Sequence, residues 1–508
     1  MVRLLVTAAL TALTPIVIFA VWSSLRPKRS YPPGPPPAFL VGNLKDIPSG
    51  GHEWEQWVAL AKKYATDVLY LRVLGADIVV ISSFEAAREL LDKRGAIYSS
   101  RPRMVLIKEV MDWAWNLVLM DYGPTFQAYR KVVQSEFTPA VVADKHRAVI
   151  QREVATLLGR LLVSPQKLVR HIKLMSGGVI MDISYGHRVL SERDEYVALA
   201  VAMRENADGQ PGTSIVDVFP PLKYVPAWFP GAGFKRNALI GAQLSRDMRD
   251  KPYNAAKRQM VEGTAAPSLA TRLLSQHGLE TAGVERDEFI KNCCGVVYSA
   301  GADTTATALT NFALAMTLYP DLQRRAQDEL DGVVGRDRLP TMEDRKRLPY
   351  VNNLVKEVLR WKVVTNLGVP HSTTSDDTYE GGYIPKNTTV IANIYAMLHD
   401  ESVYASPETF NPDRYVPSAE NPSGEPDPAR AVFGFGRRIC PGRFFADESV
   451  WLAVASVLHV FTLSVPATAG KSHVRWCSGL VNEPSPFPFE IQPRFEDARE
   501  VIARAESE

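Results

Sequence analysis

The chain has 508 residues, 46% of them apolar, and a formal net charge of +2. The apolar share is ample for a large core, the length allows two or three domains or one large one, and the near-zero charge shows no bias toward nucleic acid. No CxxC pair occurs, so neither a zinc site nor a disulfide scaffold is indicated, and a reducing compartment fits the four cysteines, Cys293, Cys294, Cys440 and Cys477.

The first patterned segment runs from Leu4 to Trp22 and contains no charged residue. A helix of that length, at about 1.5 Å per residue, just spans a bilayer core of about 30 Å. The alternative is a cleaved signal peptide, but the apolar run is long and no clear small-residue cleavage site follows it. We predict a membrane anchor over residues 1–25. The basic residues that follow it place the rest of the chain in the cytosol by the positive-inside rule.

Residues 26–37 are predicted to be a basic, proline-rich linker whose prolines make it a stiff extended spacer. A β-hairpin is predicted over Val68 to Ser82, because β-branched residues alternate on both sides of a Gly-Ala-Asp turn. From Phe84 to about Pro320 the pattern is mostly helical. One interruption, from Phe219 to Phe234, is rich in proline and aromatic residues. Both a packed loop and a connector that contacts a membrane fit this segment.

A long apolar helix is predicted from about Glu288 to Tyr319, and it contains the polar residues Asp303 and Thr304. Buried polar groups cost free energy unless they are paired. The presence of these two residues in an apolar helix therefore points to a specific role. Gly301 and Thr304 can open the helix into a local bulge, which is a common feature of functional sites. The alternative is a threonine hydroxyl that bonds back to its own helix.

Further helices are predicted at 321–330 and 350–361. In the second, Glu357 and Arg360 are three residues apart and share one face, a pattern that usually marks a surface ion pair. Short strands follow, with Tyr383-Ile384-Pro385 expected as a turn between them. The polar end of the chain, residues 494–508, is predicted to be a tail.

Cys440 lies in the segment Phe-Gly-Phe-Gly-Arg-Arg-Ile-Cys-Pro-Gly, just before a predicted helix with Pro441 in its first turn and an apolar run from Phe444. The positive end of that helix and the Arg438 guanidinium would lower the pKa of the thiol. Gly436 and Gly442 would let the backbone lie close to a flat ligand. A thiolate in this setting can bind haem iron. The alternative is a buried free cysteine in a glycine-rich turn.

This segment, FGFGRRICPG, resembles the haem-binding loop of the cytochrome P-450 family, and the resemblance extends over nearly the whole chain. It implies a mostly α fold with a minor β-sheet region, in which residues 38–493 form one large catalytic domain behind the transmembrane helix. It also implies haem b with an axial thiolate from Cys440. The other cofactor-binding residues implied are Arg130, His371, Phe433, Arg438, Gly436 and Gly442.

The resemblance also assigns roles to the remaining motifs. Thr304 and Asp303 match the oxygen-activation motif, in which they help to deliver protons. Glu357, Arg360 and Arg414 look like the family's structural triad. The helix that carries Arg130 usually has a tryptophan four residues before the arginine, and its indole bonds a haem propionate. Here Phe126 stands in that place. Asn366, at a position that is often proline, is expected to face the pocket.

The function implied is a haem-thiolate monooxygenase that inserts one atom of O₂ into a lipophilic small molecule. The stretch from Arg360 to His371 resembles fungal microsomal members of the family that act in secondary metabolism, which suggests a substrate such as a terpenoid. Electrons would come from NADPH through a cytochrome P-450 reductase, with cytochrome b5 as a second donor, and the enzyme would sit in the endoplasmic reticulum membrane. The alternatives are a haem-thiolate isomerase or dehydratase, which needs no reductase, and a non-catalytic haem-binding protein.

Overall fold

The computed structural model describes residues 29–206, 214–419, 421–466, 474–476 and 479–507. The expected anchor at residues 4–22 lies outside these ranges. Within them, no helix combines the length and the apolar character needed to cross a membrane.

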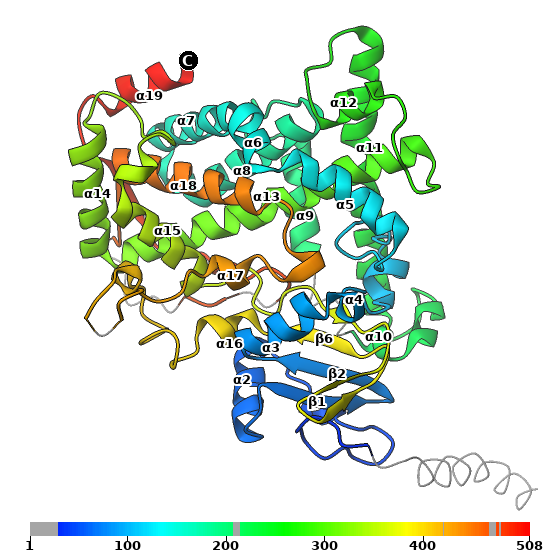
Figure 1. Cartoon of the computed structure of the whole chain (residues 1–508). Coiled ribbons are helices and arrows are strands. Elements are labelled where there is room, and N and C mark those ends of the chain that lie inside the picture. The colour runs from blue at the N-terminus through cyan, green and yellow to red at the C-terminus, as the bar shows by residue number, and fades with distance from the viewer. Residues whose placement is uncertain (1–28, 207–213, 420, 467–473, 477–478, 508) are drawn as a thin grey trace, which may run out of the picture.

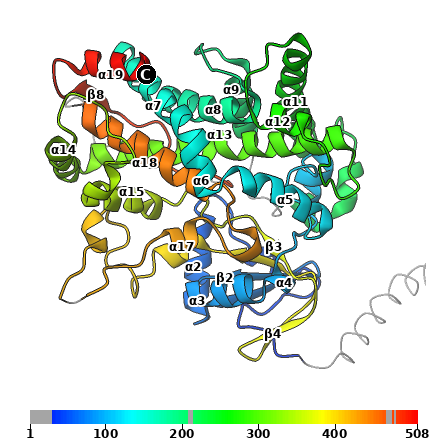
Figure 2. The same cartoon turned by 45° about the horizontal axis from the view of Figure 1, so that its top comes forward.

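Helices form the larger part of the molecule, and a small sheet lies at one end (Figure 1). The long helix α13, Arg286–Leu318, runs through the middle of the helical part and packs against α8, α9, α11 and α18 (Figure 2). The other helices are α2 Glu53–Lys63, α3 Phe84–Ala87, α4 Gly95–Tyr98, α5 Pro124–Glu136, α6 Pro139–Val141, α7 Arg147–Val163, α8 Leu168–Tyr185, α9 Glu195–Asn206, α10 Ile215–Val218, α11 Gly233–Glu262, α12 Leu269–Ser275, α14 Pro320–Val334, α15 Pro349–Trp361, α16 Ile394–Leu398, α17 Ala429–Val432, α18 Arg443–Val460 and α19 Ala498–Ser507.

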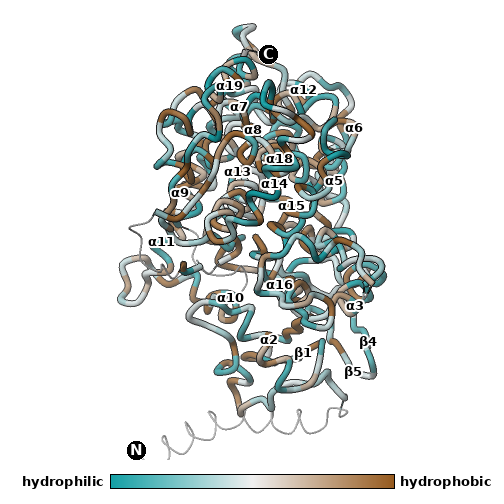
Figure 3. The backbone as a smooth tube through the Cα atoms, turned by 90° about the vertical axis from the view of Figure 1, so that its left-hand side faces the viewer, coloured by the Kyte–Doolittle hydropathy of each residue, from teal (hydrophilic) through white to brown (hydrophobic). Residues whose placement is uncertain are grey.

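The composition of each helix explains its place. Helices α13 and α18 are apolar on almost every side, and most of their residues are buried, as expected for helices inside a core. The outer helices carry both hydrophobic and hydrophilic residues along their length (Figure 3). Helix α13 begins after Glu285, whose carboxylate accepts hydrogen bonds from the backbone N–H groups of Asp287 and Glu288.

The largest sheet has the strand order β1-β2-β6-β3. The predicted hairpin is confirmed, with β1 antiparallel to β2, while β6 runs parallel to β2 and antiparallel to β3. Two further sheets are two-stranded, β4 with β5 and β7 with β8. The strands are β1 Val68–Val73, β2 Ala76–Ile81, β3 His371–Ser372, β4 Asp377–Tyr379, β5 Gly382–Ile384, β6 Thr389–Ala392, β7 Phe461–Ser464 and β8 Glu490–Pro493.

The proline-rich linker, described from residue 29, lies against the sheets. The backbone N–H of Tyr383 donates to the Ser30 carbonyl at 2.6 Å, and that of Tyr70 donates to the Pro33 carbonyl at 3.0 Å. The ring of Tyr31 stacks on the ring of Tyr70, with 4.6 Å between their centroids. The extended conformation predicted for this segment is therefore held by the domain that follows it.

Two local predictions are wrong. Tyr383 and Ile384 belong to β5, and the turn lies just before them, where Glu380 and Gly381 both have positive φ. Residues 498–507, expected within a polar tail, form helix α19, which packs on α7 (Figure 1). Its buried residues Ala498, Val501 and Ile502 follow helical spacing, so a short apolar stripe anchors a segment whose overall composition is polar.

Candidate active site

Cys440 lies between a tight loop and the first turn of α18. Its backbone N–H donates to the Phe433 carbonyl at 2.8 Å, which closes the loop. Gly436 has φ +54°, and a Cβ there would lie 2.2 Å from the carbonyl oxygen of Leu91. Only glycine therefore lets the loop approach so closely. Gly442 is the residue directly before α18.

The thiol of Cys440 is surrounded by protein, and burial raises its pKa. The Gly442 N–H and the charges of Arg130 and Arg443 act in the opposite direction, but burial is the largest effect. The expectation that Arg438 lowers the pKa of this thiol is wrong, because Arg130 and Arg443 are the cations that act on it. Metal coordination would deprotonate such a thiol, so the site suits a metal-bound thiolate better than a free one.

Three buried or half-buried arginines lie close to this loop and donate to neutral acceptors. Arg438 donates to the carbonyls of Ser99 and Met120, at 2.7 and 2.6 Å. Arg130 donates to the carbonyl of Ile439 at 2.6 Å and to the side chain of Gln134. Arg101 donates to three carbonyls, those of Val118, Val369 and Pro370. In the described part of the chain, none of the three arginines forms a salt bridge with a carboxylate.

Burial lowers the pKa of all three arginines, and it brings the pKa of Arg438 to about 10. The charge of Arg438 lowers the pKa of Arg101 further. Buried charges without a counter-ion are costly, and an anion among them would remove the cost. A haem carries two propionates, so the residues present fit that group on the evidence of their own unpaired charge.

Arg101 is a member of this cluster that sequence reasoning missed. It lies in an irregular segment between α4 and α5 and is only 8% exposed. No periodic pattern marks it, and a single arginine beside a proline is not informative. Its burial and its nearness to Arg438 depend on the tertiary structure.

His371 begins strand β3, and its Nδ1 lies 2.7 Å from the Tyr98 carbonyl. A carbonyl only accepts, so Nδ1 carries a proton. Burial, together with the charges of Arg101 and Arg438, holds the pKa of His371 well below its usual value. The ring is therefore neutral, and its Nε2 is an acceptor. A propionate at Nε2 would require the imidazolium form, and its negative charge would raise that pKa.

Helix α13 is continuous through Gly301, Asp303 and Thr304, so the predicted bulge is not formed. The Thr304 hydroxyl donates to the Ala300 carbonyl at 2.9 Å, which is the alternative considered above. Gly301 serves packing, because a Cβ there would lie 2.7 Å from the side chain of Ile180 on α8. The Gly301 carbonyl also accepts from the Ser176 hydroxyl of α8, at 3.0 Å.

Asp303 belongs to a group of four charges. Its Oδ2 lies 3.3 Å from Nε of Arg204 on α9, and the same nitrogen lies 3.8 Å from Glu483. Lys173 on α8 pairs with Glu483 at 2.9 Å. Burial raises the pKa of Asp303, Arg204 lowers it and Glu483 raises it. The group thus links α8, α9 and the segment near the end of the chain to the motif on α13.

Both halves of the site keep some accessible surface. Ala300 is exposed and Thr304 is half-buried, although most of α13 is buried. Cys440 also keeps accessible surface, even though protein surrounds it. Accessible surface of this kind is what a bound cofactor or substrate would cover.

The predicted triad forms a fully buried ion-pair cluster instead of a surface pair. Glu357 Oε1 lies 2.7 Å from Arg360 and 3.1 Å from Arg414. The Tyr415 hydroxyl donates to the other carboxylate oxygen at 2.8 Å. Arg360 also donates to the Leu398 carbonyl, so the cluster ties α15 to the segments that lead to the cysteine loop.

Asn366 lies in the loop between α15 and β3, and its side chain is enclosed. It is 2% exposed, and neither of its amide atoms has a hydrogen-bond partner. Its backbone carbonyl accepts from the N–H of Tyr395 at 3.1 Å. The expectation that Asn366 faces the pocket stays a prediction, since its enclosed amide has no partner within the described residues. The nearby Val364 and Val369 are the more accessible residues of this loop.

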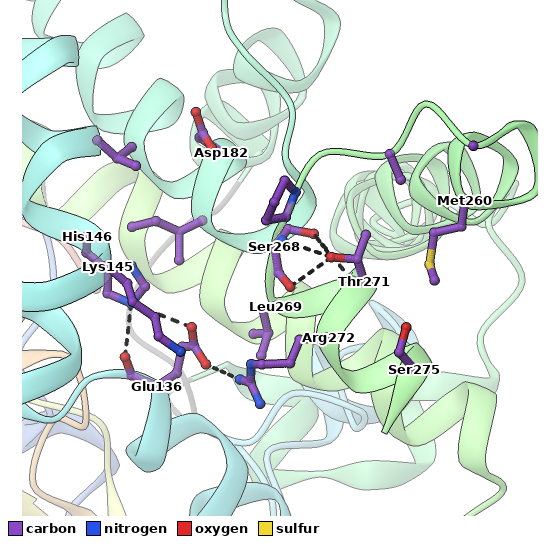
Figure 4. Close-up of a pocket in the computed structure, with 15 residues that line it drawn as sticks. Glu136, Lys145, His146, Asp182, Met260, Ser268, Leu269, Thr271, Arg272 and Ser275 are labelled. Atoms are coloured by element: carbon purple, nitrogen blue, oxygen red, sulfur yellow. Dashed lines mark hydrogen bonds and ion pairs between the residues drawn. The ribbon is translucent and has the colours of Figure 1, made fainter. Parts of the chain in front are cut away.

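A separate cavity of about 730 Å³ lies between α5, α7, α8 and the α11–α12 connection (Figure 4). Most of its charged lining is paired: Arg272 forms an ion pair with Glu136, and Asp182 with Arg152. The ring of His146 lies 3.0 Å from the Glu136 carbonyl, while Lys145 is exposed. None of the predicted site residues lines it. The buried charges of this cavity are therefore already paired, in contrast to the arginines around Cys440.

Known proteins are similar to this chain over almost its whole length. The sequence model of the family Cytochrome P-450 matches residues 32–491. A cytochrome P-450 monooxygenase of Armillaria gallica is 38% identical over 501 residues, covering 96% of both chains. One from Postia placenta is 38% identical over 492 residues, covering 96% of this chain and 95% of the relative. One from Coprinopsis cinerea is 37% identical over 497 residues, covering 96% and 94%.

Proposed function

This chain belongs to the cytochrome P-450 family and is a haem-thiolate monooxygenase supplied with electrons by a reductase, and we propose that Cys440 is its axial ligand. The observation that carries the assignment is a set of three arginines: Arg130 and Arg438 at the cysteine loop, and Arg101 beside Arg438. None of them has a carboxylate partner among the described residues. These residues would bind the two propionates. His371 is a further donor once its ring is protonated.

The haem, when bound, supplies the binding and reductive activation of O₂, with one oxygen atom transferred to the substrate and the other released as water after two electrons and two protons are added. The protein must then deliver protons and exclude bulk water. We assign proton delivery to the half-buried Thr304 hydroxyl, which would have to turn from the Ala300 carbonyl to carry it out. Asp303 is the acid next to it, and the raised pKa of Asp303 favours its proton-carrying form.

We propose a lipophilic small molecule as substrate, in the class of fungal secondary metabolites such as terpenoids. By resemblance to the family, residues 104–120 and 364–369 form part of the pocket wall. They carry apolar residues, among them Trp113, Trp115, Val364 and Val369. The indole N–H of Trp113 is buried and has no hydrogen-bond partner among the residues that the structure describes, whereas that of Trp115 donates to Ser245. An oxygen on an otherwise apolar substrate is the partner that Trp113 lacks.

We propose that the enzyme is held at the endoplasmic reticulum membrane, with its catalytic domain in the cytosol. Exposed aromatic residues between α9 and α11 support a second membrane contact: Phe219, Tyr224, Trp228 and Phe229 are 53%, 77%, 79% and 49% exposed. Near the start of the domain, Phe39 and Leu40 are 74% and 64% exposed. Apolar side chains left in water in this way suit an interface that buries them.

The proposed electron donor is an NADPH–cytochrome P-450 reductase that meets basic residues on the cysteine side. Lys131 is 3.1 Å from Glu280 and both side chains are largely exposed, so the partner must compete with that pair. Arg437 donates to the Tyr122 hydroxyl and Arg443 lies over the Phe444 ring, so both also have structural contacts. Charge reversal at Lys131 should therefore change reduction rates with the least effect on the fold.

The ferrous–carbon monoxide spectrum tests the ligand assignment. Cys440→Ser should lose the red-shifted band of the thiolate complex, while Cys293→Ser and Cys294→Ser, in the buried part of α13, should keep it. Survival of the band in Cys440→Ser would exclude this ligand. NADPH consumption with a reductase and a library of terpenoids then tests the substrate class.

A further inference from the structure

Phe126 occupies the position on α5 at which the family's usual motif has a tryptophan, and its ring has a specific neighbour. The guanidinium carbon of Arg438 lies 3.8 Å from the centroid of the Phe126 ring. Phe126 is 3% exposed, so the contact is shielded from water. A cation over a shielded aromatic face is attracted more strongly than one in solvent.

Arg438 has few other sources of electrostatic stabilisation. Its short hydrogen bonds go to the backbone carbonyls of Ser99 and Met120. Asp121 attracts it from a distance that allows no salt bridge, and Arg130 repels it. The Phe126 ring is thus the electron-rich side-chain surface in direct contact with this buried charge.

The contact continues toward the protein surface. Phe126 packs against Tyr122, with 5.5 Å between ring centroids. The guanidinium carbon of Arg437 lies 5.1 Å from the centroid of the Tyr122 ring, and Arg437 also donates to the Tyr122 hydroxyl at 2.9 Å. Two arginines from the cysteine loop therefore contact two successive aromatic rings at the start of α5.

We propose that Phe126 is a positioning residue: its ring face holds the Arg438 guanidinium in place to bind a haem propionate, and so replaces the hydrogen bond that an indole would have given. The proposal rests on haem being the cofactor of this site. In the family's usual motif, an indole N–H bonds the propionate. In this chain, a guanidinium held by an aromatic ring would bind the propionate instead.

The same geometry makes tryptophan a poor replacement here. The Phe126 site is nearly closed to solvent and is bounded by Arg438 and Tyr122. A larger indole would have to displace one of them, and overpacking of a closed site is destabilising. Restoring the residue usual in the family should therefore fail to improve haem binding unless Arg438 moves.

The test is the rate of haem transfer from the holoprotein to an excess of apomyoglobin. Phe126→Leu keeps an apolar side chain without a ring, and it should speed haem loss by about 2-fold to 30-fold, the range expected for one cation–π contact. Phe126→Met is a second variant in case the first folds poorly. The midpoint potential should also become more negative, because a less fixed positive charge stabilises the reduced haem less.

The double-mutant cycle separates the contact from simple packing. If the ring acts through Arg438, Phe126→Leu should have no further effect in an Arg438→Leu background. Multiplicative effects of the two changes, or wild-type haem loss in both Phe126 variants, would overturn the proposal. Phe137→Leu is the matched control, since this 4% exposed ring follows α5 and packs on His146 and Phe445. A Phe137→Leu protein that loses haem equally fast would also overturn it. Failure of the wild-type protein to bind haem would instead contradict the proposed function.

Discussion

Replacing Arg204 by glutamine should make the stability of the protein depend more steeply on pH. Nε of Arg204 lies 3.3 Å from Asp303 and 3.8 Å from Glu483, and the side chains of Arg204 and Asp303 are 14% and 22% exposed. The change leaves two acids with Lys173 as the one remaining cation of the group. Asp303 in particular loses the main charge that favours its ionised form.

The size of the effect follows from the geometry. Two unit charges 3.3 Å apart attract by about 5 kcal/mol at an effective dielectric constant of about 20, and part of this offsets desolvation. Removing one partner of a buried pair costs roughly 3 to 5 kcal/mol. Because this pair keeps some exposure, we expect about 3 kcal/mol at pH 8.

The sign of the pH dependence is fixed by the raised pKa of Asp303. The folded protein holds a proton on this carboxyl at pH values where the unfolded chain has lost it, so stability falls as pH rises through that window. Without Arg204 the pKa of Asp303 rises further, and the fall extends to higher pH. Urea unfolding at pH 5 and pH 8 should therefore show a larger deficit for Arg204→Gln at pH 8.

The control is Lys167→Gln, which removes a cation from an exposed pair with Glu192 and should have a small effect at both pH values. Asp303→Asn combined with Arg204→Gln should reduce the added pH dependence. Equal deficits of Arg204→Gln at pH 5 and pH 8 would refute the view that Arg204 holds an ionised Asp303.

Three more outcomes are expected. Thr304→Ala should keep haem and substrate affinity but form product roughly 10²–10⁴-fold more slowly, with more hydrogen peroxide per NADPH. Thr310→Ala loses the same type of bond, to Ala306 on the same helix, and should leave product formation unchanged. Full coupling of NADPH consumption to product in Thr304→Ala would contradict the relay. Glu357→Gln should lower the free energy of unfolding by roughly 3–5 kcal/mol in urea titrations. Loss of the exposed Glu89–Lys93 pair should lower it by less than about 1 kcal/mol. Similar decreases in the two variants would argue against the buried triad. A protein lacking residues 1–29 should still bind liposomes in part, and Trp228→Ser should weaken this binding; complete release by truncation alone would exclude the second contact.

The sequence by itself was enough for the family, the cofactor and the long elements. The motif can be recognised without any knowledge of the fold, because its diagnostic residues lie within ten positions: Phe433, Gly436, Arg438, Cys440 and Gly442. The hairpin at Val68 and the helices near Glu288 and Tyr350 follow from periodic patterns that local structure obeys. Short elements were harder, since three buried apolar residues were enough to turn the expected tail into α19.

Tertiary structure decided which charges are paired and which are not. Arg101, Arg130 and Arg438 come from three distant segments, and only their packing shows that they gather near Cys440 without a carboxylate. Arg204 and Asp303 are about a hundred residues apart, yet they form one ion pair. Electrostatic interactions depend on distance in space and on burial, and neither can be calculated from spacing along a chain. The sequence therefore determined which cofactor the protein uses, whereas the fold determined how the charges around it are held.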